Sequence, residues 1–284
     1  MKTIKAETRY GAMLVPAADI CVGRSLVEYG EWTQAEIDVL AQMIRPGMTV
    51  LDIGANVGYH TLAFSKMVGA TGTVVSFEPQ PRIFQLLAAN IANNDLQNVT
   101  ALNMAVGESR GYVDMPSFTY DDPKNYGTFS ARDRLIGEQA EARYLPVPVQ
   151  RLDDMAYARA ANVIKMDVEG MELSALAGAA GILKNRRPLM FIENDKLDLS
   201  EKLIRFLDDT GYDCYWQLAR LFKANNFKHS PVNLFENQAC INMLVVPKEL
   251  TINIKGMPKI VDFSEHPFRM DQETFKSRFQ VQSV

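Results

Sequence analysis

The segment Asp52-Ile53-Gly54-Ala55-Asn56-Val57-Gly58 most constrains how this chain can fold. It follows the apolar run Thr49-Val50-Leu51 and precedes a stretch with helical patterning, so it predicts a tight turn from a strand into a helix. Gly54 and Gly58 allow the turn and the close approach of a ligand, because they carry no side chain. Asp52, at the end of the strand, places a negative charge where the turn opens.

The glycine spacing differs from the G-x-G-x-x-G pattern of dinucleotide-binding turns, because Asn56 stands where the second glycine would be. Asp52 would repel a diphosphate, whereas it would attract the ammonium group of an amino-acid-like cofactor such as S-adenosylmethionine. A second acid, Glu78, ends the next predicted strand, where a carboxylate can accept hydrogen bonds from both ribose hydroxyls. The two acids favour S-adenosylmethionine, and the glycine pattern argues against an NAD-dependent dehydrogenase.

Length and composition bound the class of protein. A chain of 284 residues can bury one large core, so one main domain is expected. The net charge of -4, without a dense Lys/Arg cluster, argues against a nucleic-acid partner. No apolar run approaches the roughly 20 residues of a membrane span, and the start of the chain lacks a secretion signal. Cys21, Cys214 and Cys240 lack metal-ligand spacing and are expected to be reduced thiols in a cytoplasmic protein.

The order of predicted elements indicates an α/β fold with a doubly wound, seven-stranded, mostly parallel sheet. The predicted strands cover 49–52, 73–77, 99–104, 162–166, 189–192, 212–218 and 241–246. A capping box at Thr33–Glu36 predicts a helix before the first of them. Leu173, Leu176, Ala180 and Leu183 lie at the spacing of one helix face after the fourth strand.

Three parts of the chain are expected: an N-terminal extension and helix over 1–46, the main domain over 47–247, and a weakly patterned tail over 248–284. Within the main domain, residues 116–143 lack a regular pattern and are predicted to form a lid over the cofactor; the alternative is a loose surface insertion. Its aromatic residues could stack on a ring of a ligand or only anchor the loop. They are Phe118, Tyr120, Tyr126 and Phe129.

Four predicted strands end in an acid: Asp52, Glu78, Asp167 and Glu193. Ligands of open α/β sheets bind at the carboxyl ends of the strands, so these side chains are expected to share one cleft. If the first two hold the cofactor, the last two face the group that accepts its methyl. A base is required only when that group is a poor nucleophile such as an alcohol.

Two mechanisms compete for the second pair of acids. Asp167 or Glu169 could accept the hydroxyl proton directly, or Asp167, Glu193 and Asn194 could bind Mg²⁺. The direct route is favoured, so no metal is predicted. His60, near the glycine turn, is a further candidate base, although a histidine there more often packs against the helix start or hydrogen-bonds it. Asp167 could also cap the next helix, and Glu172 could be a solvated or ion-paired helix residue.

Four segments together resemble the FkbM family of S-adenosylmethionine-dependent methyltransferases, over roughly residues 29–247. The most specific is Lys165-Met166-Asp167-Val168-Glu169-Gly170-Met171-Glu172. The others are Val50-Leu51-Asp52-Ile53-Gly54-Ala55-Asn56-Val57-Gly58-Tyr59, Phe77-Glu78-Pro79, and Arg187-Pro188 with the following strand to Glu193.

The resemblance implies a class I, Rossmann-like methyltransferase fold and a set of site residues. Those implied to contact the cofactor are Glu31, Asp52, Gly54, Ala55, Asn56, Gly58, Tyr59, Glu78, Pro79, Ala105, Val106 and Asp167. Asp167 and Glu169 would lie between the cofactor and the acceptor, with Glu193 and His60 as further catalytic candidates. Family members methylate oxygen, often on sugar hydroxyls of glycans, glycolipids or natural products, and occasionally on carboxylates.

The leading hypothesis is therefore an O-methyltransferase acting on a hydroxyl of a small-molecule or glycan acceptor. A carboxyl methyltransferase is the first rival, because a carboxylate needs no base. A module that binds the cofactor without catalysis is the second. Assembly as a homodimer is left open.

Overall fold

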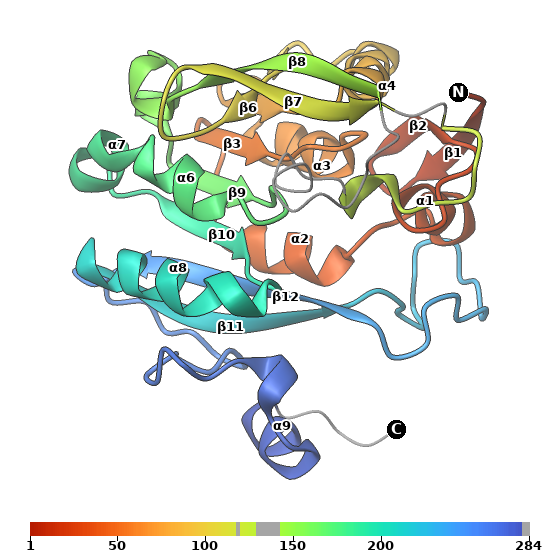
Figure 1. Ribbon diagram of the computed structural model, residues 1–284. Helices are drawn as coiled ribbons and strands as arrows, with labels where there is room; N and C mark the ends of the chain where they lie inside the picture. Colours follow the sequence, from red (N-terminus) through yellow and green to blue (C-terminus); the bar gives the residue numbers. More distant parts are fainter. Residues whose placement is uncertain (118–119, 129–142, 280–284) are drawn as a thin grey trace.

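A seven-stranded sheet forms the centre of the computed structural model, which describes residues 1–117, 120–128 and 143–279 (Figure 1). The strand order is β11-β12-β10-β9-β3-β4-β5. Strand β12 is antiparallel to both of its neighbours, whereas the other neighbouring pairs are parallel. The predicted mostly parallel, seven-stranded sheet is confirmed.

The strands of this sheet are β3 (Thr49–Ile53), β4 (Thr73–Phe77), β5 (Val99–Leu102), β9 (Val163–Met166), β10 (Leu189–Glu193), β11 (Tyr212–Arg220) and β12 (Ala239–Pro247). The helices that follow its parallel strands are α3 (Tyr59–Val68), α4 (Pro81–Asn93), α6 (Glu172–Ala177), α7 (Ala180–Asn185) and α8 (Leu197–Asp209).

Helices cover both faces of the sheet, as the doubly wound prediction requires. In β3, Val50 packs in one buried cluster with Leu62 of α3, whereas Leu51 packs in a second cluster with Leu203 and Leu207 of α8. Alternate side chains of a strand point to opposite faces, so a strand buried on both reads as a continuous apolar run. This explains why β3, β4, β9 and β10 were visible in the sequence.

The N-terminal part contains a hairpin that the sequence did not predict, β1 (Thr3–Thr8) paired with β2 (Gly11–Pro16). Helices α1 (Val22–Tyr29) and α2 (Gln34–Leu40) follow it. The predicted helix is present in α2, but the capping box is wrong. Thr33 has a left-handed backbone (φ 40°) and makes no side-chain capping bond, and Glu36 is committed to other partners.

The single helix predicted after the fourth strand is wrong, because the structure divides it into α6 and α7. Asp153, 28 residues away, accepts hydrogen bonds from the backbone amides of Gly181 (2.8 Å) and Ile182 (2.9 Å). These are first-turn amides of α7, which have no partner within their own helix. A contact distant in sequence therefore fixes a new helix start inside the predicted one.

A smaller sheet, in the order β6-β8-β7, lies beside the main one. Its strands are β6 (Ala105–Val106), β7 (Gly111–Ser117) and β8 (Arg143–Gln150). The short 3-10 helices are η1 (Tyr126–Thr128), η2 (Leu152–Asp154), η3 (Ala158–Ala160) and η4 (Pro267–Arg269), and α9 (Gln272–Phe279) lies in the C-terminal tail. No helix in the described ranges has the length and apolar character needed to cross a bilayer.

Candidate active site

One cavity of about 380 Å³ lies at the carboxyl ends of β3, β4, β9 and β10, a volume within the range of small-molecule sites. It collects most of the residues that the sequence singled out. The predicted site residues among its lining are Gly54, Ala55, Asn56, Gly58, Tyr59, His60, Glu78, Pro79, Ala105, Val106, Asp167, Glu169 and Glu193. Asp52 lies beneath it with no exposed surface, linked to the lining residue Lys165.

The glycine turn brings two strand ends into direct contact. Gly54 has φ 82°, and a Cβ there would lie 1.7 Å from the carbonyl oxygen of Asp167. Gly58 has φ 95° and Asn56 φ 51°, a conformation that asparagine tolerates better than most residues. The turn therefore depends on the glycines and the asparagine at these positions. At Gly54 the backbone after β3 is in direct contact with the backbone after β9.

Asp52 anchors this turn from below. Its Oδ2 accepts a hydrogen bond from Thr61 Oγ1 (2.6 Å), and its Oδ1 lies 3.9 Å from Lys165 Nζ. Within the described residues, Oδ1 has no hydrogen bond. A buried carboxylate oxygen in that state requires a partner, because the large majority of buried polar atoms have one.

Glu78 closes the next side of the cavity. Its two carboxylate oxygens accept the backbone amides of Asn56 (2.9 Å) and Gln80 (2.8 Å). Burial raises its pKa to about 7. Each oxygen retains a lone pair for a further donor, as a ribose contact requires.

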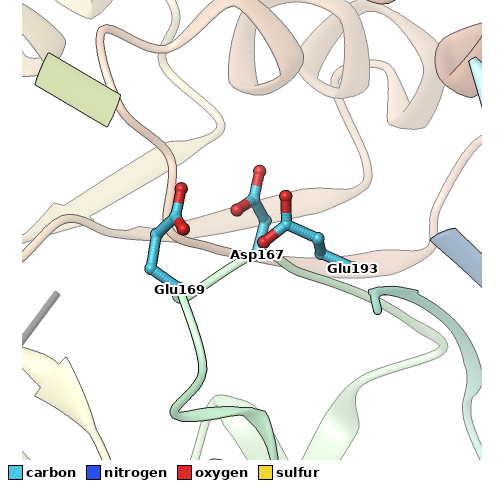
Figure 2. A group of neighbouring side chains, drawn as sticks. All are labelled: Asp167, Glu169 and Glu193. Atoms are coloured by element: carbon cyan, nitrogen blue, oxygen red, sulfur yellow. The ribbon is translucent and has the colours of Figure 1, made fainter. Parts of the chain in front are cut away.

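Three carboxylates gather on the opposite side of the cavity, at the ends of β9 and β10. Figure 2 shows the side chains of Asp167, Glu169 and Glu193 converging, and each offers an oxygen within 4.8 Å of the others. Burial, together with the charge of Asp167, raises the pKa of Glu169 to about 8. Burial and the same neighbouring carboxylates hold the pKa of Glu193 well above its ordinary value.

Lys196 partly neutralises this group. Its Nζ lies 2.7 Å from Glu169 and 2.8 Å from Asp195. Burial opposes the charge of Lys196, but Glu169 and Glu193 raise its pKa above the ordinary value. The cluster thus combines several acids with the ammonium groups of Lys196 and, at Asp167, of Lys165.

Lys165, quoted above only as part of a motif, joins the two sides. It is 3% exposed, donates to the Gly54 carbonyl (3.2 Å) and to Asp167 Oδ2 (3.3 Å), and faces Asp52. Burial alone would lower its pKa, but Asp167 and Asp52 raise it above the ordinary value. No sequence pattern could have indicated this role, because a lysine inside a strand looks like any polar residue.

The structure decides two alternatives from the sequence: that Asp167 caps the next helix, and that Glu172 is a solvated or ion-paired helix residue. Asp167 does not cap α6, whose N-cap is Met171 without a side-chain bond. Glu172 is not solvated and has no ion pair among the residues that the structure describes: it is buried and accepts the amides of Val168 (3.2 Å) and Gly170 (3.1 Å). It therefore shapes the loop that carries Glu169.

Glu31, implied by the resemblance as a cofactor contact, does not line the cavity. Its carboxylate accepts hydrogen bonds from Arg9 (2.7 Å) and the Phe227 amide (3.0 Å). Glu36, five residues later, lines the cavity instead, with its Oε2 3.3 Å from His60 Nε2.

The predicted lid is only partly described. Phe118 and Phe129 lie outside the described residues. Tyr120 and Tyr126 are buried, with ring centres 4.6 Å apart, and Gln80 binds both, accepting from the Tyr120 hydroxyl (3.1 Å) and donating to the Tyr126 carbonyl (2.9 Å). In residues 120–128 these aromatics therefore anchor the segment beside Glu78.

Comparison with known proteins gives partial matches. The chain is 28% identical over 124 residues to a protein-L-isoaspartate O-methyltransferase of Caenorhabditis elegans (42% of this chain, 54% of the relative). It is 25% identical over 143 residues to Methyltransferase 1 of Beauveria bassiana (45% and 57%). The chain spans about half the length of these curated relatives.

Among solved structures, the methyltransferase FkbM of Methylobacillus flagellatus is 18% identical, with a TM-score of 0.42 over 77% of this chain and 52% of that one. The model of the family described as "Methyltransferase FkbM domain" matches residues 52–214, which run from Asp52 of the glycine turn to Cys214 of β11. Since this match covers more than half of the chain, the protein belongs to the FkbM methyltransferase domain family.

Proposed function

We propose that the protein is an S-adenosylmethionine-dependent O-methyltransferase that methylates a hydroxyl of a carbohydrate, glycolipid or secondary metabolite. The observation that carries this proposal is one cavity with Glu78 and the glycine turn on one side and Asp167, Glu169 and Glu193 on the other, with Asp52 buried beneath the turn. The cytoplasm is the proposed compartment, supported by three free cysteines.

The cofactor side fits S-adenosylmethionine by its donors and acceptors. The Glu78 oxygens offer two acceptors to the ribose, and Asp52, buried beneath the glycine turn, holds Lys165 at the cavity wall. Phe77, Met104 and Val106 provide apolar surface for the adenine. When bound, the cofactor supplies a methyl group activated by the positive charge on its sulfur.

The acceptor side fits an alcohol. Asp167 or Glu169 would accept the hydroxyl proton as the acceptor oxygen takes the methyl group and the bond from that methyl to the cofactor sulfur breaks, a role worth about 10²–10⁴ in rate. With a pKa of about 8, Glu169 accepts a proton only in its ionised form, whose fraction increases as the pH rises through 8. His60 is the remaining base candidate.

A carboxyl acceptor is the second candidate, favoured by the relatives named protein-L-isoaspartate O-methyltransferase. A carboxylate acceptor is already nucleophilic and needs no base. The hydroxyl is preferred here because the cavity gathers three carboxyl groups that can serve as one.

The test combines Asp167→Asn and Glu169→Gln with Asp154→Asn as a control, since Asp154 pairs with Arg110 outside the cavity. Release of S-adenosylhomocysteine is measured with panels of sugars and of carboxylic acids, and cofactor affinity by calorimetry. Loss of sugar turnover with affinity kept, and an unchanged control, supports the proposal. Retained turnover in both variants overturns the base assignment.

Two further outcomes decide between the rivals. Turnover of carboxylic acids alone identifies the carboxyl methyltransferase. A wild-type protein that binds S-adenosylhomocysteine but methylates neither panel contradicts catalysis on these acceptor classes and favours the binding module.

A further inference from the structure

A carboxylate and an imidazole face each other in the wall of the cavity, apart from the three clustered acids. Glu36 of α2 and His60 of α3 are 4% and 6% exposed, and Glu36 Oε2 lies 3.3 Å from His60 Nε2. Glu36 Oε1 accepts a hydrogen bond from Asn242 Nδ2 (3.1 Å), whose other proton goes to Gln217 (3.1 Å). These bonds fix Glu36 from β12.

His60 Nε2 is buried and lies at ion-pair distance from Glu36, but it makes no hydrogen bond within the described residues. Buried ring nitrogens are rarely left in this state. A ligand in the cavity that offers an oxygen would complete its bonding.

The location of the pair indicates which part of a ligand it meets. His60 is two residues beyond Gly58, in the first turn of the ten-residue helix α3. The first-turn amides of a helix lack intrahelical partners and favour negative charge, and Gly58 has no side chain to cap them. Asn56 and Val57, at the turn before the helix, line the same cavity.

An α-amino acid end is a zwitterion, which needs donors for its carboxylate beside an acceptor for its ammonium. The start of α3 with His60 supplies the donors, and Glu36 supplies a negative acceptor next to them. A neutral sugar hydroxyl would need neither charge. An acceptor carboxylate would find the same donors only by entering the end of the cavity that the glycine turn closes.

We infer that Glu36 and His60 bind the α-amino-acid end of the cofactor: His60 and the first turn of α3 hold its carboxylate, and Glu36 its ammonium. This inference rests on the proposed use of S-adenosylmethionine. His60 then binds the cofactor and does not act as the base considered above. Glu36 also has a binding function, which the sequence did not indicate because the residue fits a capping-box pattern.

The test compares two ligands that differ only at this end. S-adenosylhomocysteine carries the amino-acid group, whereas 5′-methylthioadenosine keeps the adenosine and sulfur without it. Calorimetry on wild-type protein, Glu36→Gln and His60→Gln should show S-adenosylhomocysteine binding weakened by about 10- to 100-fold in both variants. Binding of 5′-methylthioadenosine should change less than about twofold, which also verifies that the variants fold.

Each other outcome is informative. If both ligands weaken equally, or if neither does, the assignment of Glu36 and His60 is overturned. If S-adenosylhomocysteine affinity is kept while turnover falls in His60→Gln, His60 acts at the acceptor and the inference fails. If wild-type protein binds neither ligand, the proposed function itself fails.

Discussion

The contact between the glycine turn and β9 leads to a quantitative prediction for Gly54→Ala. Gly54 has φ 82°, and its new Cβ would lie 1.7 Å from the Asp167 carbonyl oxygen and 2.8 Å from the carbonyl carbon. The Asp167 backbone cannot move away freely, because its amide donates to the Ile53 carbonyl (3.0 Å). Relieving the overlap would therefore separate β3 from β9 by more than an ångström.

Gly47→Ala is the matched control. Gly47 has nearly the same backbone angle (φ 84°), and a Cβ there meets only Thr71 Oγ1 at 3.6 Å, an ordinary contact. Both substitutions carry the left-handed penalty of roughly 1–2 kcal/mol. The difference between them isolates the overlap, which should cost about 3 kcal/mol more at position 54.

Urea unfolding followed by fluorescence measures both free energies of unfolding, and calorimetry measures S-adenosylhomocysteine binding. We expect Gly54→Ala to lose about 3 kcal/mol relative to Gly47→Ala and to bind the ligand at least tenfold more weakly. A difference below about 0.5 kcal/mol would refute the claim that the two strand ends are in unyielding contact.

The carboxylate cluster gives three more predictions. Since the pKa of Glu169 is about 8, kcat/KM should rise by up to about tenfold per pH unit below that value and then level off, and a flat profile between pH 6 and 9 would contradict carboxylate base catalysis. The pKa of the Glu169 carboxyl is 4.5 in the unfolded chain and about 8 in the folded protein, so the folded protein binds this proton more tightly. The free energy of unfolding should therefore fall as the pH rises from about 4.5 to 8. Glu169→Gln should flatten the dependence of Tm on pH over that window. Lys196 already neutralises Glu169 and Asp195, so dialysis against EDTA should leave turnover within about twofold, and restoration by added Mg²⁺ of a lost activity would instead identify a metal site.

The sequence predicted the site residues whose position follows from the order of the predicted strands. Asp52, Glu78, Asp167 and Glu193 each end an apolar run, and parallel strands align their carboxyl ends at one edge. The strand order was therefore enough to place Glu78, Asp167 and Glu193 at one cavity, whereas Asp52 lies buried beneath it. Gly54 and Gly58 were visible for a similar reason, because only a few residue types adopt such a turn.

The remaining features depend on contacts between distant segments. Glu31 matched a family element, but Arg9 of the unpredicted hairpin region occupies its carboxylate. Glu36 fits a local capping pattern, whereas Asn242 and His60 determine its actual surroundings. The break between α6 and α7 is set by Asp153, which lies before β9. Local propensity is a weak prior when tertiary partners compete for the same groups.

The single ammonium of Lys165 connects what would otherwise be two independent groups of acids. It contacts Asp52 on the side proposed for the cofactor and Asp167 on the side proposed for the acceptor, and it also binds the Gly54 carbonyl of the turn between them. A buried lysine remains charged only where carboxylates offset its desolvation, so its charge and the positions of both acids depend on one another. A shift of the end of β3 would therefore move the end of β9 as well, because Lys165 is paired with an acid on each. The alignment that in-line methyl transfer needs thus depends on both sides of the cavity together.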